Sequence, residues 1–159
     1  MSSFTKPLII AYDPEASAAL GGTYWRLWSD FKYELGAKGS GRWVYVPAGF
    51  LTDGASVPRA FWSIIPPWGA YGQAAVLHDY LCEFLSVTIN GLPKSISRAE
   101  CDRILDEAMG VLGVPDATRS TIYEAVCLYR KVSGVAAPSS TAKKRALEAA
   151  WVPSITLAG

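Results

Sequence analysis

The chain has little of several residue types on which common functional sites depend. Its 159 residues include one histidine, His78, and three cysteines, Cys82, Cys101 and Cys127. The cysteines show no C-x-x-C spacing, and a single histidine supplies only one nitrogen ligand. A zinc site with three or four nitrogen and sulfur ligands is therefore excluded. An odd cysteine count favours three buried thiols, although a bridge from Cys127 to Cys82 or to Cys101 stays open.

The sequence also lacks a strong net charge and any long apolar run. The 15 basic residues nearly balance the 14 acidic ones, and the formal net charge is +1. The basic cluster at 143–145 is typical of a solvent-exposed helix face, so nucleic-acid binding is not indicated. No apolar run approaches the roughly 18 residues of a spanning helix, and residues 1–10 lack signal-peptide features. We therefore expect synthesis in the cytoplasm without a signal peptide.

What the sequence does contain is apolar and aromatic side chains in quantity. Half of the residues are hydrophobic and 12% are aromatic, which is enough to close a core in one domain. The first third of the chain favours strands, which we place at 7–12, 23–35, 42–47 and 50–52. Glycines between 36 and 41 mark a hairpin between the second and third strands, and Pro47 and Gly49 leave the fourth as a short edge strand.

The rest of the chain favours helices. Their apolar residues recur at helical spacing, and we place them at 71–85, from Ser97 to near Gly113, from Pro115 to Gly134, and at 141–151. Ser97 and Glu100 have the spacing of a capping box, which marks the start of the second helix. Between the first two helices, the Asn90-Gly91 pair indicates either a two-stranded hairpin or a loop.

Together these elements predict an α+β fold. An N-terminal antiparallel sheet is followed by a three-helix core, whose first helix carries the His-Asp pair, and by a short C-terminal helix. We expect a single domain over 1–135, made of a sheet region at 1–52 and of a site loop and helices at 53–135. Residues 136–159 would form a linker, the short helix and a C-terminal arm.

Candidate chemistry concentrates between residues 50 and 84. This stretch contains His78, followed at once by Asp79, and an acidic turn at Asp53-Gly54. Successive residues on a helix point about 100° apart. His78 and Asp79 therefore do not bond to each other, but they can serve two neighbouring sites.

His78 lies beside the apolar stripe of its helix and suits a general base, because imidazole titrates near physiological pH. A catalytic histidine needs a third group that fixes its tautomer and stabilises the imidazolium. Asp102, at the margin of the next apolar stripe, would supply that group if the two helices are antiparallel. Tyr123 and Tyr129 on the third helix are candidates to hold the Asp102 carboxylate.

The acidic residues favour a hard cation. Calcium takes about six to eight oxygen ligands from carboxylates, backbone carbonyls and water. Asp53 and Asp79 offer carboxylates, and the backbone at Asp53-Gly54 or at Trp68-Gly69 offers carbonyls. Such a cation would polarise a carbonyl group and stabilise its oxyanion.

Each of these residues also has an ordinary structural explanation. A lone histidine near an apolar stripe is often a satisfied core residue, and Asp53 at a turn can cap the segment that follows it. Asp102 near a helix start can favour the helix dipole. Asp79 has possible ion-pair partners in Arg59, Arg98 and Arg103.

The order of these motifs resembles a phage and prophage family of small proteins of unknown function. The resemblance covers about 35–134 and rests on T-D-G-A-S-V-P at 52–58, P-P-x-G-x-Y at 66–71, H-D-Y-L at 78–81, S-R-A-E-C-D-R-I-L at 97–105 and I-Y-E-A-V at 122–126. It implies a phage or prophage origin and supplies no activity.

A more distant similarity is to the secreted bacterial phospholipase A2 enzymes. These carry a D-G-C-S turn, an H-D helix, a second helix with an aspartate, and a third with a tyrosine and A-V. By that resemblance His78 would activate water against an ester carbonyl, with Asp102 orienting it. Asp53, Asp79 and the Gly54 carbonyl would bind calcium.

The chain departs from those enzymes in two ways. Ala55 replaces the turn cysteine and Ala74 stands where a cysteine precedes the histidine, so the disulfide framework is missing. Residues 7–52 have no counterpart in the enzymes and are candidates to dock onto other virion proteins.

Two functions follow from these patterns. One is a phage-encoded, calcium-dependent hydrolase that acts on phospholipid esters of the host envelope. The other is a non-catalytic virion protein of the tail tip or neck, in which the His/Asp cluster is a structural polar network. An amidase or peptidase activity at the same site is a third alternative.

Overall fold

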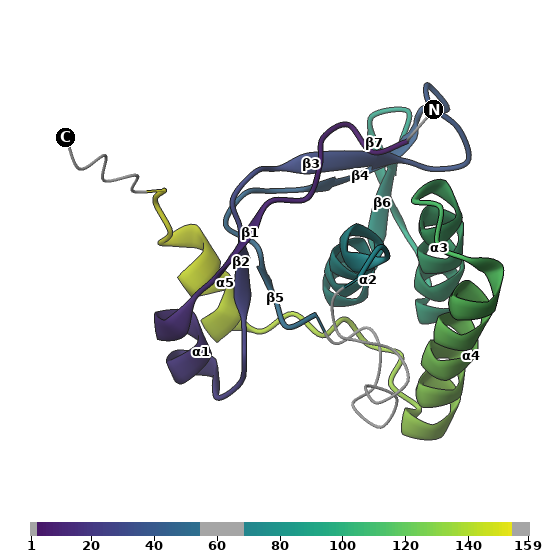
Figure 1. Ribbon diagram of the computed structural model, residues 1–159. Coiled ribbons are helices and arrows are strands. Elements are labelled where there is room, and N and C mark those ends of the chain that lie inside the picture. The colour runs from purple at the N-terminus through teal and green to yellow at the C-terminus, as the bar shows by residue number, and fades with distance from the viewer. Residues whose placement is uncertain (1–2, 55–68, 154–159) are drawn as a thin grey trace.

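Two antiparallel sheets and five helices are formed by residues 3–54 and 69–153, the residues that this computed structural model describes (Figure 1). The fold is α+β, as predicted. Segment 55–68 of the predicted site loop and the end of the predicted C-terminal arm at 154–159 lie outside the described residues.

The smaller sheet has the order β1-β2-β5 and consists of β1 (Ile10–Tyr12), β2 (Trp25–Leu27) and β5 (Leu51–Thr52). The sequence analysis missed α1 (Pro14–Leu20), which lies between β1 and β2. The Asp13 side chain caps this helix by accepting a hydrogen bond from the Ala16 backbone N–H at 2.9 Å. A capping aspartate followed by proline is a helix-start signal, but we interpreted it only as the end of a strand.

The larger sheet has the order β3-β4-β6-β7. The hairpin between β3 (Phe31–Glu34) and β4 (Arg42–Val46) confirms the predicted pairing, with Phe31 opposite Val46. The single strand predicted over 23–35 is wrong, because the chain breaks after β2 and its two halves join different sheets. In β3 buried and half-buried residues alternate, whereas in β2 the adjacent Arg26 and Leu27 are both buried, so β2 is covered on both faces.

The segment after the first long helix adds two strands to this sheet. β6 (Ser86–Ile89) and β7 (Leu92–Ser95) form a hairpin, and β6 pairs with β4. Asn90 and Gly91 both adopt positive φ, of 50° and 81°, as a two-residue hairpin turn requires. The hairpin alternative is therefore confirmed.

The long helices follow the predicted boundaries closely. They are α2 (Gly72–Phe84), α3 (Arg98–Val111) and α4 (Asp116–Ser133). The capping box of Ser97 and Glu100 is formed, and Gly134 ends α4 with a φ of 66°. In Figure 1, α2 lies beneath the larger sheet, α3 packs beside it, and α4 covers the outer side of α3. Leu77, Leu81 and Leu105 are fully buried where these layers meet.

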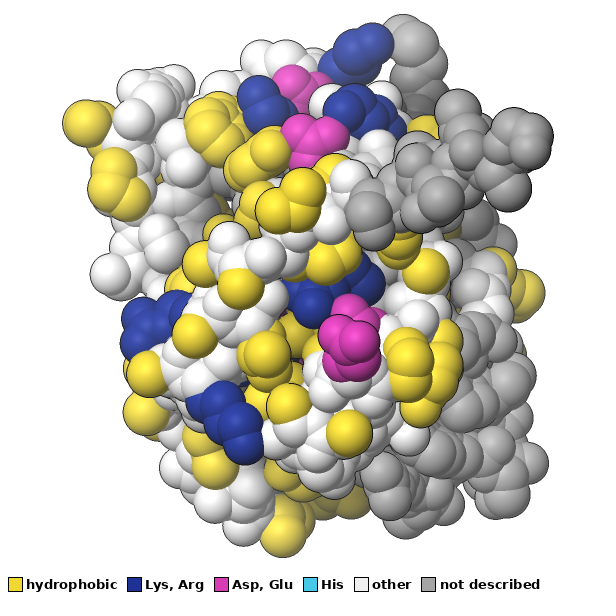
Figure 2. All heavy atoms as spheres, turned by 90° about the vertical axis from the view of Figure 1, so that its left-hand side faces the viewer, with side chains coloured by type: hydrophobic (Ala, Val, Ile, Leu, Met, Phe, Trp, Pro, Cys, Tyr) yellow, Lys and Arg dark blue, Asp and Glu magenta, His cyan; other side chains and the backbone are white. Residues whose placement is uncertain are grey.

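The last helix, α5 (Ala142–Ala149), packs back against the smaller sheet. Arg26 of β2 donates to the Leu147 carbonyl at 3.2 Å, and Glu148 accepts from the Leu51 backbone N–H at 2.9 Å. The Trp28 and Trp151 rings meet edge to face with centroids 5.3 Å apart. The face that carries α1 and α5 shows basic and acidic side chains scattered among hydrophobic ones (Figure 2).

Candidate functional site

The two candidate residues on α2 contact different neighbours, as helix geometry predicts. His78 is buried between α2 and α3, and its Nε2 lies 2.8 Å from Oδ1 of Asp102. The structure thus brings together the two residues to which we assigned the general base and its orienting group. Across the helix, Asp79 faces the end of β5 instead.

Asp102 is held by a third residue that the sequence analysis missed. Its second carboxylate oxygen, Oδ2, accepts a hydrogen bond from Nε of Arg130 on α4 at 2.7 Å. Arg130 therefore takes the place that we assigned to Tyr123 and Tyr129. Tyr129 is 60% exposed, and the side-chain hydrogen bond of Tyr123 is to Cys127. Helical spacing was the available signal, because Arg130 follows the buried Val126 by four residues and faces the same way.

The three side chains form a charged group inside the helical layer. Burial on its own raises the pKa of Asp102, but hydrogen bonds from His78 and Arg130 outweigh burial and hold that pKa below its usual value. Burial on its own lowers the pKa of His78, but hydrogen bonds to Asp102 and Cys82 raise it to about 10. An imidazolium, a carboxylate and a guanidinium therefore lie in contact at neutral pH.

Cys82 lies one turn after His78, with its Sγ 3.6 Å from His78 Nε2. A hydrogen bond with Cys101 and the neighbouring His78 lower the pKa of Cys82. In a cysteine-histidine-acid triad the thiol and the acid meet opposite ring nitrogens. Here Cys82 and Asp102 both approach Nε2, so this geometry does not form such a relay. All three cysteines are free thiols, but of the three expected buried thiols only Cys101 is buried, whereas Cys82 and Cys127 are half-buried.

Asp79 is tied to the turn that carries Asp53 and Gly54. Its Oδ2 accepts a hydrogen bond from the buried Thr52 hydroxyl at 2.6 Å, and the Gly54 backbone N–H donates to the same hydroxyl oxygen at 3.3 Å. Burial, together with the negative charge of Asp53, raises the pKa of Asp79 to about 7. The two carboxyl groups predicted to bind a cation are therefore close enough to repel each other.

A pocket of about 350 Å³ opens beside this pair. Its lining residues come from the end of α1, the turns beside β2 and β5, α2, α5 and the segment that leads into it, and are Leu20, Tyr24, Asp53, Asp79, Glu83, Ser139, Thr141 and Lys144. Only 7% of Glu83 is exposed, and its Oε2 has no hydrogen-bond partner among the described residues. The pocket thus combines three acidic side chains.

Lys144 supplies the positive charge in this pocket. Its ammonium forms an ion pair with Oε1 of Glu83, and only 8% of the residue is exposed. The interpretation of 143–145 as a solvent-exposed face is therefore wrong for Lys144, because its side chain turns inward to Glu83 and to the ring of Phe50. Burial lowers the pKa of Lys144, whereas Glu148, Asp79 and Asp53 act in the opposite direction.

The oxygen donors around Asp79 match a hard cation in chemical type. Asp53 and Asp79 offer two carboxylates, and Gly54 follows with a φ of 70°, a backbone conformation that glycine adopts without strain. Within residues 3–54 and 69–153, no three or more His, Cys, Asp or Glu side chains converge on one metal position. A cation here would therefore depend on backbone carbonyls and water as well as on the two aspartates, and it would compete with Lys144.

These features define an α+β protein in which a buried His-Asp-Arg group and an acidic pocket lie on adjoining sides of one helix. The chain belongs to the family described as "Protein of unknown function (DUF1353)", whose match covers residues 25–126. That segment contains Asp53, His78, Asp79 and Asp102, whereas Arg130 and Lys144 lie beyond it.

A curated relative shares part of this segment. The chain is 41% identical over 86 residues to "Uncharacterized protein y4jT" of Sinorhizobium fredii (strain NBRC 101917 / NGR234). The match covers 53% of this chain and 23% of the relative, so the chain spans less than a quarter of that protein's length. No solved structure matches the chain. Among the described residues, no helix is both long and apolar enough to cross a membrane.

Proposed function

We propose that this protein is a phage-encoded, calcium-dependent hydrolase that cleaves phospholipid esters of the host envelope in the manner of phospholipase A2. The observation that supports the proposal is the 2.8 Å contact between His78 Nε2 and Asp102 Oδ1. The next residue of α2, Asp79, faces a second acidic residue, Asp53. A base and a cation site would thus lie side by side on α2.

In this mechanism Asp102 accepts the Nε2–H of neutral His78, which leaves Nδ1 as the basic nitrogen. Nδ1 takes a proton from a water molecule as its oxygen attacks the ester carbonyl carbon, and the imidazolium then protonates the leaving alkoxide. Arg130 positions Asp102. Asp53, Asp79 and the Gly54 carbonyl would hold calcium, which supplies Lewis-acid stabilisation of the oxyanion.

The charge state of His78 sets a condition on this activity. A histidine whose pKa is raised to about 10 is mostly protonated at neutral pH and is then no base. The hydrolase rate should therefore rise about tenfold per pH unit through the neutral range, as the neutral imidazole fraction grows.

The test is release of fatty acid from phospholipid vesicles at pH 9 with millimolar calcium. We expect wild type to be active and His78→Asn to be inactive with an unchanged circular dichroism spectrum. Glu124→Gln, at an exposed position of α4, is the control variant and should retain full activity. A wild type that releases no fatty acid with calcium at any pH from 7 to 10 would refute the proposal.

A second function is favoured by the charged state of the same group. His78, Asp102 and Arg130 form a charged network, with one carboxylate between two cations, that joins α2, α3 and α4, and Lys144 already balances part of the acidic pocket. Such a network would stabilise a non-catalytic virion protein of the tail tip or neck. This alternative predicts that the protein copurifies with phage particles, and its absence from them would contradict the alternative.

A further inference from the structure

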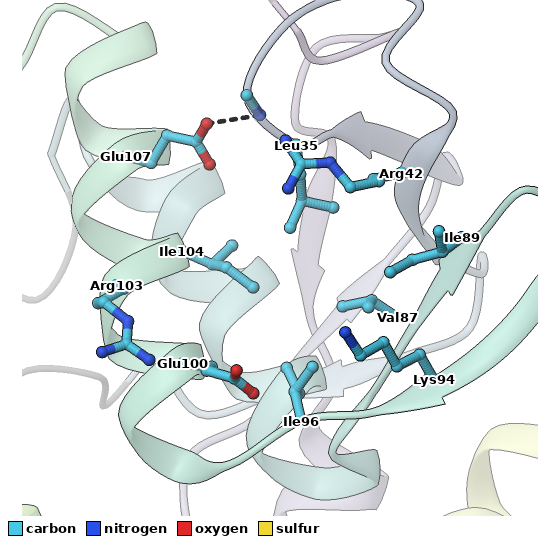
Figure 3. Close-up of a pocket in the computed structure, with 11 residues that line it drawn as sticks. Leu35, Arg42, Val87, Ile89, Lys94, Ile96, Glu100, Arg103, Ile104 and Glu107 are labelled. Carbon is cyan, nitrogen blue, oxygen red and sulfur yellow. Dashed lines mark hydrogen bonds between the residues drawn. The ribbon is translucent and has the colours of Figure 1, made fainter.

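A second pocket lies on the other side of α3 from the proposed site (Figure 3). Its volume is about 380 Å³. One wall is a single face of α3, formed by residues at positions i, i+3, i+4 and i+7: Glu100, Arg103, Ile104 and Glu107. The opposite wall comes from the larger sheet and the turns that flank it.

The floor of this α3 pocket is apolar. Leu35, Val87 and Ile104 are buried at its base, with exposures of 9%, 4% and 7%. Ile89 and Ile96 are half-buried and extend the apolar surface toward the opening. An apolar floor of this kind favours the burial of a hydrocarbon chain or ring.

The rim of the α3 pocket is basic. Arg42, Lys94 and Arg103 are exposed, and they come from β4, β7 and α3 respectively. None of the three is in an ion pair with any residue that the structure describes. Figure 3 shows Lys94 reaching from its strand toward the middle of the opening.

The two glutamates of the rim are each bonded to the backbone. Glu107 Oε1 accepts from the Gly36 N–H at 2.5 Å, and Glu100 Oε2 accepts from the Ser97 N–H at 2.8 Å as part of the capping box. Both carboxylates thus hold local structure together, at the turn after β3 and at the start of α3. The rim thus carries three cationic side chains and two carboxylates, and both carboxylates are hydrogen-bonded to the backbone. Its excess positive charge is complementary to a negative group.

We propose that the α3 pocket binds a small amphipathic anion, that is, an apolar chain of about ten carbons that ends in a single anionic group. The chain would lie against Val87, Ile96 and Ile104, and the anionic group would meet Lys94 and Arg103. The proposal is independent of the hydrolase, because Asp102 points from α3 into the helical layer and takes no part in this pocket. All the lining residues lie within the segment that matches the family.

The test is titration of the protein with decanoate below its critical micelle concentration. Calorimetry gives the affinity, and methyl NMR of the Ile, Leu and Val side chains locates the site. Decanol and decyltrimethylammonium carry the same chain without the negative charge, and decyl phosphate replaces the carboxylate. We expect saturable binding of decanoate or decyl phosphate, with shifts at Val87, Ile96 and Ile104, and binding of the two other probes weakened about tenfold or more.

Two double variants complete the test. Lys94→Gln with Arg103→Gln removes two exposed charges from the rim and should lower the affinity for decanoate about tenfold. Lys131→Gln with Lys143→Gln makes the same change of net charge on α4 and α5, and should bind decanoate like wild type. Equal affinity for decanol, equal weakening in both double variants, or the absence of saturable decanoate binding would each overturn the proposal.

Discussion

The contact of His78 with Asp102 predicts an unusual titration, which can be observed directly because the chain has a single histidine. The pKa of His78 is raised from 6.5 to about 10. We expect the imidazole NMR signals of His78 to remain those of the imidazolium up to about pH 9. In Asp102→Asn the carboxylate is gone and burial is opposed by the remaining interaction with Cys82, so the pKa of His78 should fall below that of wild type.

The raised pKa of His78 also determines how the free energy of unfolding depends on pH. A group whose pKa is raised in the folded state stabilises that state fully below its unfolded pKa, and the stabilisation is lost as the pH rises through the folded pKa. For a shift from 6.5 to about 10 the full contribution is at most about 5 kcal/mol, at 1.36 kcal/mol per pH unit. Most of this contribution should disappear between pH 7 and pH 10.

Urea unfolding of wild type and His78→Gln at pH 7, 8, 9 and 10 measures this loss, with circular dichroism as the signal. Other groups titrate in both proteins, so the difference between their unfolding free energies isolates His78. We expect the advantage of wild type to shrink steadily as the pH rises. A difference that stays constant from pH 7 to pH 10, or a His78 pKa near 6.5, would refute the charged arrangement and would favour a neutral base.

Four further predictions follow from the acidic pocket and from the core. Lys144→Met removes the competing ammonium, so calcium should bind about tenfold more tightly at pH 8 by calorimetry, and unchanged or weaker binding would contradict the competition. The proton of Asp79, whose pKa is raised to about 7, competes with calcium, so the affinity should fall about fivefold from pH 7 to pH 6; a pH-independent affinity would exclude Asp79 as a ligand. Leu81→Ala empties a fully buried position between α2 and its neighbours and should lower the unfolding free energy in urea by about 2–5 kcal/mol. Ser97→Ala removes the capping hydroxyl of α3 and should cost about 1 kcal/mol in the same assay, with no change in His78 titration as its control.

Local signals explain which parts of the fold were predictable. The capping box at Ser97 and the Asn90-Gly91 turn each act within a few residues, so their structural effect is present in the sequence itself. The break between Leu27 and Phe31 depends on which layers cover each half of the segment. Its alternating aromatic pattern would suit one long strand equally well, so pattern alone predicted the wrong element.

The residues of the candidate site also fall into those that were predictable from the sequence and those that were not. Helical periodicity placed His78 and Asp102 at the margins of two apolar stripes, so their contact could be predicted on the condition that the two helices pack together. It was insufficient for Arg130 and Lys144. A basic residue on a helix looks the same in sequence whether it faces water or a buried acid, and its partner lies on another element.

The sequence by itself therefore determined the three long helices, the first hairpin and the candidate status of His78 and Asp102, because each depends on local spacing or on the burial of one apolar stripe. Only the tertiary structure decided the charge balance of the site. Packing of α4 against α3 brings Arg130 to Asp102, and the attachment of α5 to the smaller sheet places Lys144 beside Asp53, Asp79 and Glu83. The physical reason is that the electrostatic energy of a buried charge depends on which elements surround it in space.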